Sequence, residues 1–134
     1  DTEINFHLYG PPSLGHEFPN SYRGEVSYAD NHQVFSSSKI NLSTHVENGD
    51  SYLNERCITV LASGGLLLID PIKGHRNVLG DDGYLVMSSN NIPEVITQIK
   101  SILREDYTRT QVVGRRNVEK YSVDNWVNQI IASM

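Results

Sequence analysis

Three polar residues at the start of a helical pattern are the best candidates for holding an anion. Asn54, Glu55 and Arg56 precede an apolar stripe with the spacing of one helix face. An arginine guanidinium can give a phosphate two parallel hydrogen bonds, and a helix N-terminus stabilises an anion by about 0.3–1 kcal/mol. The pattern therefore predicts a phosphate-binding helix start. A second interpretation stays open, in which Arg56 pairs with Glu55 or Asp50 on a solvated face.

A glycine pair and an aliphatic run follow this predicted helix, which spans Asp50 to Ser63. Gly64 and Gly65 are typical of a helix end, where a glycine adopts the left-handed conformation. The next four residues, Leu66 to Ile69, are all large aliphatics, as in a central parallel strand that is covered on both faces. Helix, glycine cap and strand form the centre of the predicted fold.

One histidine lies where an open parallel sheet binds its ligands, outside the carboxyl ends of the strands. His45 comes at the end of a predicted strand, so it is a candidate site residue, with a structural histidine as the alternative. The five histidines show no metal-ligand spacing. The single cysteine, Cys57, lies in the helical stripe, which predicts a buried thiol and no disulfide, as in the cytoplasm.

Composition limits the classes of partner. The formal net charge of -5 argues against a non-specific grip on nucleic acid or on an anionic membrane. The longest aliphatic run is too short to cross a bilayer, so no transmembrane segment is expected. Neither G-x-G-x-x-G after the first strand nor G-x-x-x-x-G-K-[ST] occurs, which argues against a dinucleotide fold and a P-loop.

The length of 134 residues predicts one domain, residues 1–134. A strand-like pattern begins almost at the first residue, so we expect the chain to be a fragment or one domain of a longer protein. Strands and helices alternate, which predicts an α/β fold with a parallel sheet and helices on both sides. The expected strands are 4–8, 25–30, 39–46, 65–70 and 84–88, and the expected helices are 31–39, 50–63, 73–79, 90–106, 107–122 and 123–134.

Several motifs occur in a fixed order along the chain. They are "SSSKINL", an N-x-R before a helix, "ASGG" followed by an aliphatic strand that ends in aspartate, and "G-x-x-G-Y-L-V". In this order they resemble the carboxyl-terminal domain of group 1 glycosyltransferases, especially the CgeB-like subgroup, from about Gly10 to the final helix. The resemblance implies a single Rossmann-like three-layer domain with a mostly parallel sheet, the C-terminal half of a GT-B fold.

The same resemblance implies a function. Such a domain binds a nucleoside diphosphate sugar, whose sugar passes to a hydroxyl of a glycan or another acceptor held mostly by an N-terminal domain. No metal or other cofactor is expected, because protein donors stabilise the leaving nucleoside diphosphate. The resemblance places the diphosphate or sugar at Asn54 and Arg56 and the base near Val26 to Tyr28, and it matches Lys39 to a family lysine. The candidate ligand-binding residues are therefore Asn54, Glu55, Arg56, Thr59, Gly64, Gly65, Tyr28 and His45, with no catalytic residue assigned.

One position departs from the family pattern. Related enzymes usually carry a glutamate five residues before the first glycine, where it binds two ribose hydroxyls, and this chain has Thr59 there. A threonine hydroxyl does not clamp two hydroxyls as a carboxylate does. Glu55, four residues earlier on nearly the same helix face, is a substitute by position. Two hypotheses follow: a glycosyltransferase donor domain, or a degenerate binding or assembly module without catalytic activity.

Overall fold

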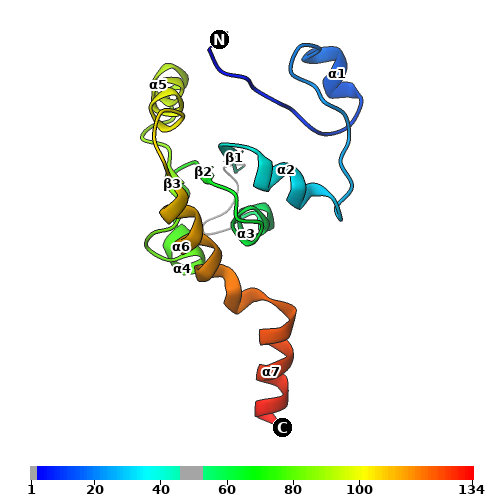
Figure 1. The fold of residues 1–134 in the computed structure, drawn as a ribbon, viewed down its shortest axis with the longest axis vertical. Coiled ribbons are helices and arrows are strands. Elements are labelled where there is room, and N and C mark those ends of the chain that lie inside the picture. Colours follow the sequence, from blue (N-terminus) through cyan, green and yellow to red (C-terminus); the bar gives the residue numbers. More distant parts are fainter. Residues whose placement is uncertain (1–2, 46–52) are drawn as a thin grey trace.

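The structure, a computed structural model, describes residues 3–45 and 53–134. Its centre is a parallel sheet in the order β1 (Asn41–Ser43), β2 (Leu67–Ile69) and β3 (Leu85–Val86) (Figure 1). Asn41 pairs with Leu67, and Leu68 pairs with Leu85. Each parallel connection requires a crossover, which α3 (Glu55–Ala62) and α4 (His75–Leu79) supply. The domain is therefore Rossmann-like, as the sequence predicts.

The strand β2 is buried on both faces, as its uninterrupted aliphatic run predicts. On one face, Leu67 and Ile69 pack with Leu61 of α3, together with apolar residues of α4 and α6 (Thr108–Val118). On the other face, Leu68 packs with Ile102 of α5 (Ile92–Ile102). The sheet thus separates two apolar clusters, and helices cover both.

Local signals set several helix ends. The Asn91 side chain caps α5 by accepting the Glu94 N–H at 3.2 Å, and Pro93 lies in the first turn. Gly64 follows α3 with φ +78°, the left-handed conformation predicted for it. The remaining helices are α1 (Ser13–Glu17), α2 (Asn31–Ser37), η1 (Glu119–Tyr121) and α7 (Val123–Ser133).

Two predicted strands are wrong. Segment 4–8 contributes only an isolated bridge between Leu8 and Tyr22, and Phe6 remains 47% exposed. Segment 25–30 contains no strand and ends in a turn before α2. Alternating polar and apolar residues form a strand only where a neighbouring strand pairs with them, and neither segment has one in the described sheet. The predicted helix start at Asp50 lies outside the described residues, and α3 begins at Glu55.

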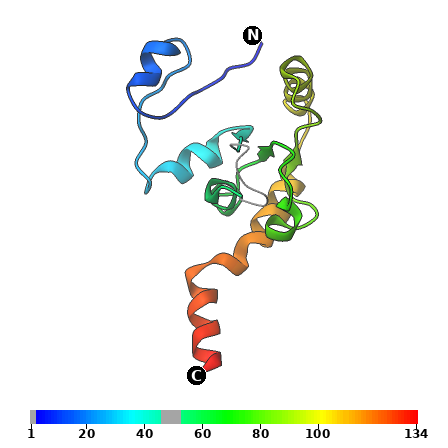
Figure 2. The same cartoon turned by 180° about the vertical axis from the view of Figure 1, so that it is seen from behind.

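The helix α7 extends from the body of the domain, with η1 at its base (Figure 2). One side of it is apolar and exposed, and we call this side the α7 apolar face. Its members are Val123, Trp126, Val127, Ile130, Ile131 and Met134. Of the described helices, none has the length and apolarity that crossing a membrane requires.

A contact between two glycines brings α6 against the rest of the domain. A Cβ on Gly114 would overlap the Gly83 carbonyl oxygen and lie 2.9 Å from Cδ2 of Leu61. A Cβ on Gly83 would in turn lie 2.5 Å from the Gly114 nitrogen. Only glycine at both positions permits this approach of α6 to α3 and to the segment before β3.

We expect Gly114→Ala to lower the free energy of unfolding by about 1–3 kcal/mol, because overpacking outweighs the better helix propensity of alanine. Urea unfolding measures the change. Val112→Ala is the matched control on the same helix, where the side chain is 54% exposed, and it should change stability by less than about 0.5 kcal/mol. Equal stability of Gly114→Ala and the wild type would contradict the close contact.

Candidate functional site

A histidine and an aspartate meet at the carboxyl ends of β1 and β2. His45 lies two residues after β1, and Asp70 directly follows β2. The His45 ring donates from Nδ1 to Asp70 Oδ1 at 2.6 Å, and its backbone N–H donates to Oδ2 at 2.8 Å. The His45 side chain is 4% exposed and that of Asp70 is 20% exposed. This bidentate contact joins the two strand ends beyond the last ladder pair.

The other ring nitrogen of His45 holds the start of α3. The backbone N–H of Asn54 donates to His45 Nε2 at 2.9 Å. Because an N–H donates to it, Nε2 is an acceptor, and the ring hydrogen lies on Nδ1 toward Asp70. His45 is therefore the neutral Nδ1–H tautomer with both nitrogens engaged. In this arrangement the ring acts through Asn54 and has no nitrogen left for a ligand.

Asn54 caps the helix that it precedes. Its backbone is extended, with φ -63° and ψ 132°, and its Oδ1 accepts the Arg56 N–H at 2.9 Å. Its carbonyl oxygen accepts the Cys57 N–H at 3.0 Å. Among the described residues, nothing accepts the N–H of Glu55 or bonds the side-chain Nδ2 of Asn54. In the part of the chain that the structure describes, these two donors at the start of α3 are therefore without a partner.

Arg56, the second residue of α3, is exposed. Within residues 3–45 and 53–134 its guanidinium has no hydrogen bond and no ion pair. Its predicted pairing with Glu55 is therefore not observed, and Asp50, the other predicted carboxylate, lies outside the described residues. A positive side chain and the amino end of α3 consequently occupy the same small region.

Thr59 and Glu55 lie one turn apart on α3, as their spacing predicts. The Thr59 hydroxyl donates to the Glu55 carbonyl oxygen at 3.2 Å, so its oxygen lone pairs are left as acceptors. The Glu55 carboxylate is exposed. The N-cap and the first five residues of α3 thus contain four predicted site residues, Asn54, Glu55, Arg56 and Thr59.

Three other predicted site residues lie elsewhere. Gly64 and Gly65 follow the far end of α3, about 12 Å along an eight-residue helix from its start. Gly65 serves packing, because a Cβ there would lie 2.7 Å from the Phe35 carbonyl oxygen. Tyr28 is 75% exposed in the turn before α2. No contact of the described residues brings these three to the start of α3.

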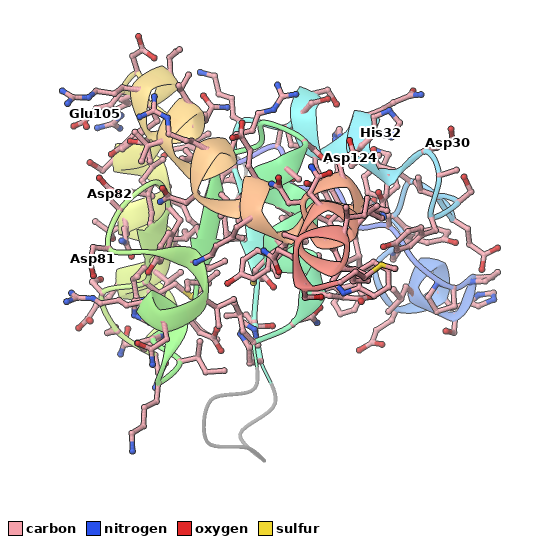
Figure 3. The ribbon with its side chains drawn as sticks, turned by 90° about the horizontal axis from the view of Figure 1, so that it is seen from below. Asp30, His32, Asp81, Asp82, Glu105 and Asp124 are labelled. Atoms are coloured by element: carbon pink, nitrogen blue, oxygen red, sulfur yellow. The ribbon has the colours of Figure 1, made fainter. Side chains whose placement is uncertain are left out.

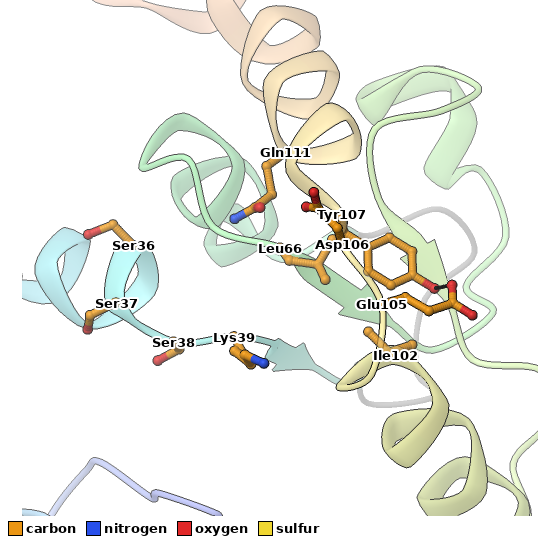
Figure 4. Close-up of a pocket in the computed structure, with 10 residues that line it drawn as sticks. All are labelled: Ser36, Ser37, Ser38, Lys39, Leu66, Ile102, Glu105, Asp106, Tyr107 and Gln111. Atoms are coloured by element: carbon orange, nitrogen blue, oxygen red, sulfur yellow. Dashed lines mark hydrogen bonds between the residues drawn. The ribbon is translucent and has the colours of Figure 1, made fainter.

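A shallow pocket of about 280 Å³ lies at the opposite edge of the sheet, at the amino ends of β1 and β2 (Figure 4). Lys39 lines it and donates to the Leu103 carbonyl oxygen at 3.3 Å, which ties the entry of β1 to the end of α5. The Glu105 carboxylate accepts the Tyr107 hydroxyl at 3.2 Å. The pocket is therefore separate from the His45 cluster. Its lining residues are Ser36, Ser37, Ser38, Lys39, Leu66, Ile102, Glu105, Asp106, Tyr107 and Gln111.

Acidic side chains do not gather into a cation site in the described part of the chain. Asp30, Asp81, Asp82, Glu105 and Asp124 are exposed. Figure 3 shows Asp81, Asp82 and Glu105 on one side of the view, Asp30 on the other and Asp124 between them. No three histidine, cysteine, aspartate or glutamate side chains among residues 3–45 and 53–134 are placed to hold a metal ion.

Cys57 lies beside His45 at the start of α3. The sequence predicts a buried structural thiol at this position. Cys57 is fully buried, with Sγ 3.5 Å from Ser43 Oγ and 3.9 Å from His45 Nε2. Burial raises the pKa of the thiol. Because Nε2 already accepts the Asn54 N–H, the ring is not free to take a proton from the sulfur. The prediction of a buried structural thiol is confirmed.

Sequence reasoning missed the pairing of His45 with Asp70. A partial signal is present, because both residues lie at the carboxyl ends of predicted strands, 39–46 and 65–70, which share one edge of a parallel sheet. That the two strands are neighbours comes from the structure. The Asp70 carboxylate proves to be the group that fixes His45.

We expect Cys57 to resist alkylation by iodoacetamide in the folded protein at pH 7.5. Its raised pKa keeps the thiol protonated, and burial excludes the reagent. Mass spectrometry measures the modification, and the same protein in concentrated urea is the control that should react fully. Rapid modification of the folded protein would show that the thiol is accessible.

Comparison with known proteins adds a family to this geometry. A family model described as glycosyl transferase-like matches residues 1–132. No curated protein matches the chain. Because the family match extends over nearly the whole length, the chain belongs to the glycosyl transferase-like family.

Proposed function

We propose that this chain is the donor-binding domain of a glycosyltransferase and holds the diphosphate of a nucleoside diphosphate sugar at the start of α3. The observation that carries the proposal is the exposed Arg56, the second residue of α3, whose guanidinium has no partner among the described residues. The neighbouring donors, Asn54 Nδ2 and the Glu55 N–H, are likewise without a partner in that part of the chain. The site also lies outside the carboxyl ends of β1 and β2, where open parallel sheets bind ligands. The proposal includes the CgeB-like subgroup and the C-terminal half of a GT-B fold.

Three kinds of donor would meet the diphosphate. Arg56 supplies two parallel N–H groups, Asn54 supplies its side-chain Nδ2, and Glu55 supplies its backbone N–H. The helix dipole adds a partial positive charge. The Glu55 carboxylate repels phosphate, so we assign it to the ribose hydroxyls, with the Thr59 hydroxyl oxygen as a nearby acceptor.

These donors would act on the charge that develops during transfer. The bond between the anomeric carbon and the phosphate oxygen breaks, and the acceptor hydroxyl oxygen bonds the anomeric carbon and loses its proton. Negative charge then grows on the leaving diphosphate, where Arg56 and the first turn of α3 stabilise it. The proposal needs no metal for this step. An acceptor domain would supply any general base.

The α7 apolar face supports a partner domain. An exposed apolar patch that runs along a whole helix is typical of a surface that another domain covers. We assign it to the N-terminal domain that would hold the glycan or other acceptor. The assignment of the nucleobase to Tyr28 rests on the family resemblance alone.

Titration calorimetry with UDP, GDP and their sugars tests donor binding. We expect at least one of them to bind, and Arg56→Ala to weaken binding by roughly 1.5–3 kcal/mol, about 10- to 150-fold, as for a charged hydrogen bond. Arg116→Ala, an exposed arginine of α6, is the matched control and should leave the affinity unchanged. Absence of binding by all of these ligands would reject the proposal in favour of a degenerate module.

Trp126 is a built-in probe of the α7 apolar face, because it is the only tryptophan and is 62% exposed. In this chain we expect the emission of a solvated indole and efficient quenching by acrylamide. Packing of the acceptor domain on α7 should shift the emission to shorter wavelength and protect it. A nucleotide sugar added alone should change neither, since its proposed site is at α3. Emission typical of a buried indole in this chain would contradict the exposed face.

A further inference from the structure

A series of hydrogen bonds runs from the sheet edge to the arginine of the candidate site. Asp70 fixes His45, His45 Nε2 accepts the Asn54 N–H at 2.9 Å, and Asn54 Oδ1 accepts the Arg56 N–H at 2.9 Å. Among the described residues, His45 is the side chain that links the ends of both strands to the first residue of the helix start. A change at His45 therefore reaches the residues proposed to hold the diphosphate.

We propose that His45 is a positioning residue that assembles the donor site only while its ring is neutral. This inference rests on the proposed function, since it concerns the same donors. The ring does not touch the donor. It fixes the backbone of Asn54, and through that backbone the direction in which Asn54 and Arg56 present their donors.

The dependence on charge follows from the roles of the two ring nitrogens. A second proton would go to Nε2, where it would face the Asn54 N–H as donor against donor. The bond from Nδ1 to Asp70 survives that change and becomes an ion pair. Protonation thus keeps the ring on β2 and releases the start of α3. The Asn54 N–H, which is part-buried, loses its partner.

Charged and titratable groups face the ring from β2 and α3. Asp70, directly after β2, accepts the Nδ1 hydrogen at 2.6 Å, and Arg56 lies two residues after Asn54 on α3. The Cys57 thiol, 3.9 Å from Nε2, is neutral because burial raises its pKa. Glu47 and Asp50 lie outside the described residues.

The first test measures donor affinity against pH with UDP-glucose and GDP-mannose. Their phosphates carry constant charge between pH 8 and pH 5.5, unlike the terminal phosphate of UDP, which gains a proton near pH 6. We expect the wild-type affinity to fall about tenfold or more over this range, by the loss of one buried hydrogen bond. A flat profile would overturn the proposal.

Two variants of His45 separate positioning from simple packing. His45→Gln places an amide oxygen near the Asn54 N–H and does not titrate, so its affinity should vary less than about twofold between pH 8 and pH 5.5. His45→Phe keeps a ring without an acceptor and should bind more weakly than His45→Gln at pH 8. The reverse order, or a pH profile in His45→Gln like that of the wild type, would contradict a role as acceptor.

Asp70→Asn gives a third variant, which tests how the ring is fixed. Both carboxylate oxygens accept a bond from His45, and an asparagine offers one acceptor oxygen and places its N–H₂ against the second donor. Donor affinity at pH 8 should therefore be lower in Asp70→Asn than in the wild type. Unchanged affinity would contradict a role of Asp70 in fixing the ring.

Nuclear magnetic resonance of the ligand-free protein separates this inference from the proposed function. In the wild type, the Asn54 and Arg56 amide signals should move with the same pH midpoint as the His45 ring, and in His45→Gln they should stay fixed. If no donor binds at any pH but these signals move, the proposed function fails and the positioning role stands. If the donor binds and these signals ignore the ring, the positioning role fails alone.

Discussion

The contact of His45 with Asp70 is the interaction on which the candidate site depends. The sheet is small, with strands of three, three and two residues, so its ladder bonds end soon after the core. Beyond Ser43 and Ile69, the Asp70 carboxylate joins the two strand ends by accepting two bonds from His45, one from its backbone N–H and one from its ring. The start of α3 is attached to this junction through His45 Nε2, which accepts the Asn54 N–H, and through the Cys57 thiol, which donates to Ser43 Oγ. A bonded polar network at a sheet edge can hold donors in place without a ligand.

Local signals account for what could be predicted of the fold. The aliphatic run of β2 encodes burial on both faces, Gly64 encodes a left-handed turn, and Asn91 encodes a cap, because each of these depends on neighbours in the chain. The two failed strands show the limit. Segments 4–8 and 25–30 have strand-like character, yet a strand exists only with a partner, which is a property of the tertiary fold.

In the candidate site, too, some features follow from neighbours in the chain and others from the tertiary fold. Asn54, Glu55 and Arg56 were found from the sequence because one helix turn keeps them together. Gly64 and Gly65 belong to the same motif, but α3 carries them to its far end, so closeness in sequence does not imply one site. His45, Asn54 and Asp70 show the converse, since they are distant in sequence and meet through the parallel sheet. The positions of His45 and Asp70 at strand ends indicate that both lie at the carboxyl edge of the sheet. The hydrogen bonds between them depend on the tertiary structure.

The proposed diphosphate would account for a placement of Arg56 that the contacts of the described residues do not explain. A cation in the first turn of a helix opposes the helix dipole, which costs a few tenths of a kcal/mol. Glu55 in the same turn offsets part of this cost, but it forms no ion pair with Arg56. Within the described residues, the stability of the fold therefore gains nothing from this arginine. A bound diphosphate would reverse the sign, because the guanidinium and the helix dipole would then attract the same anion.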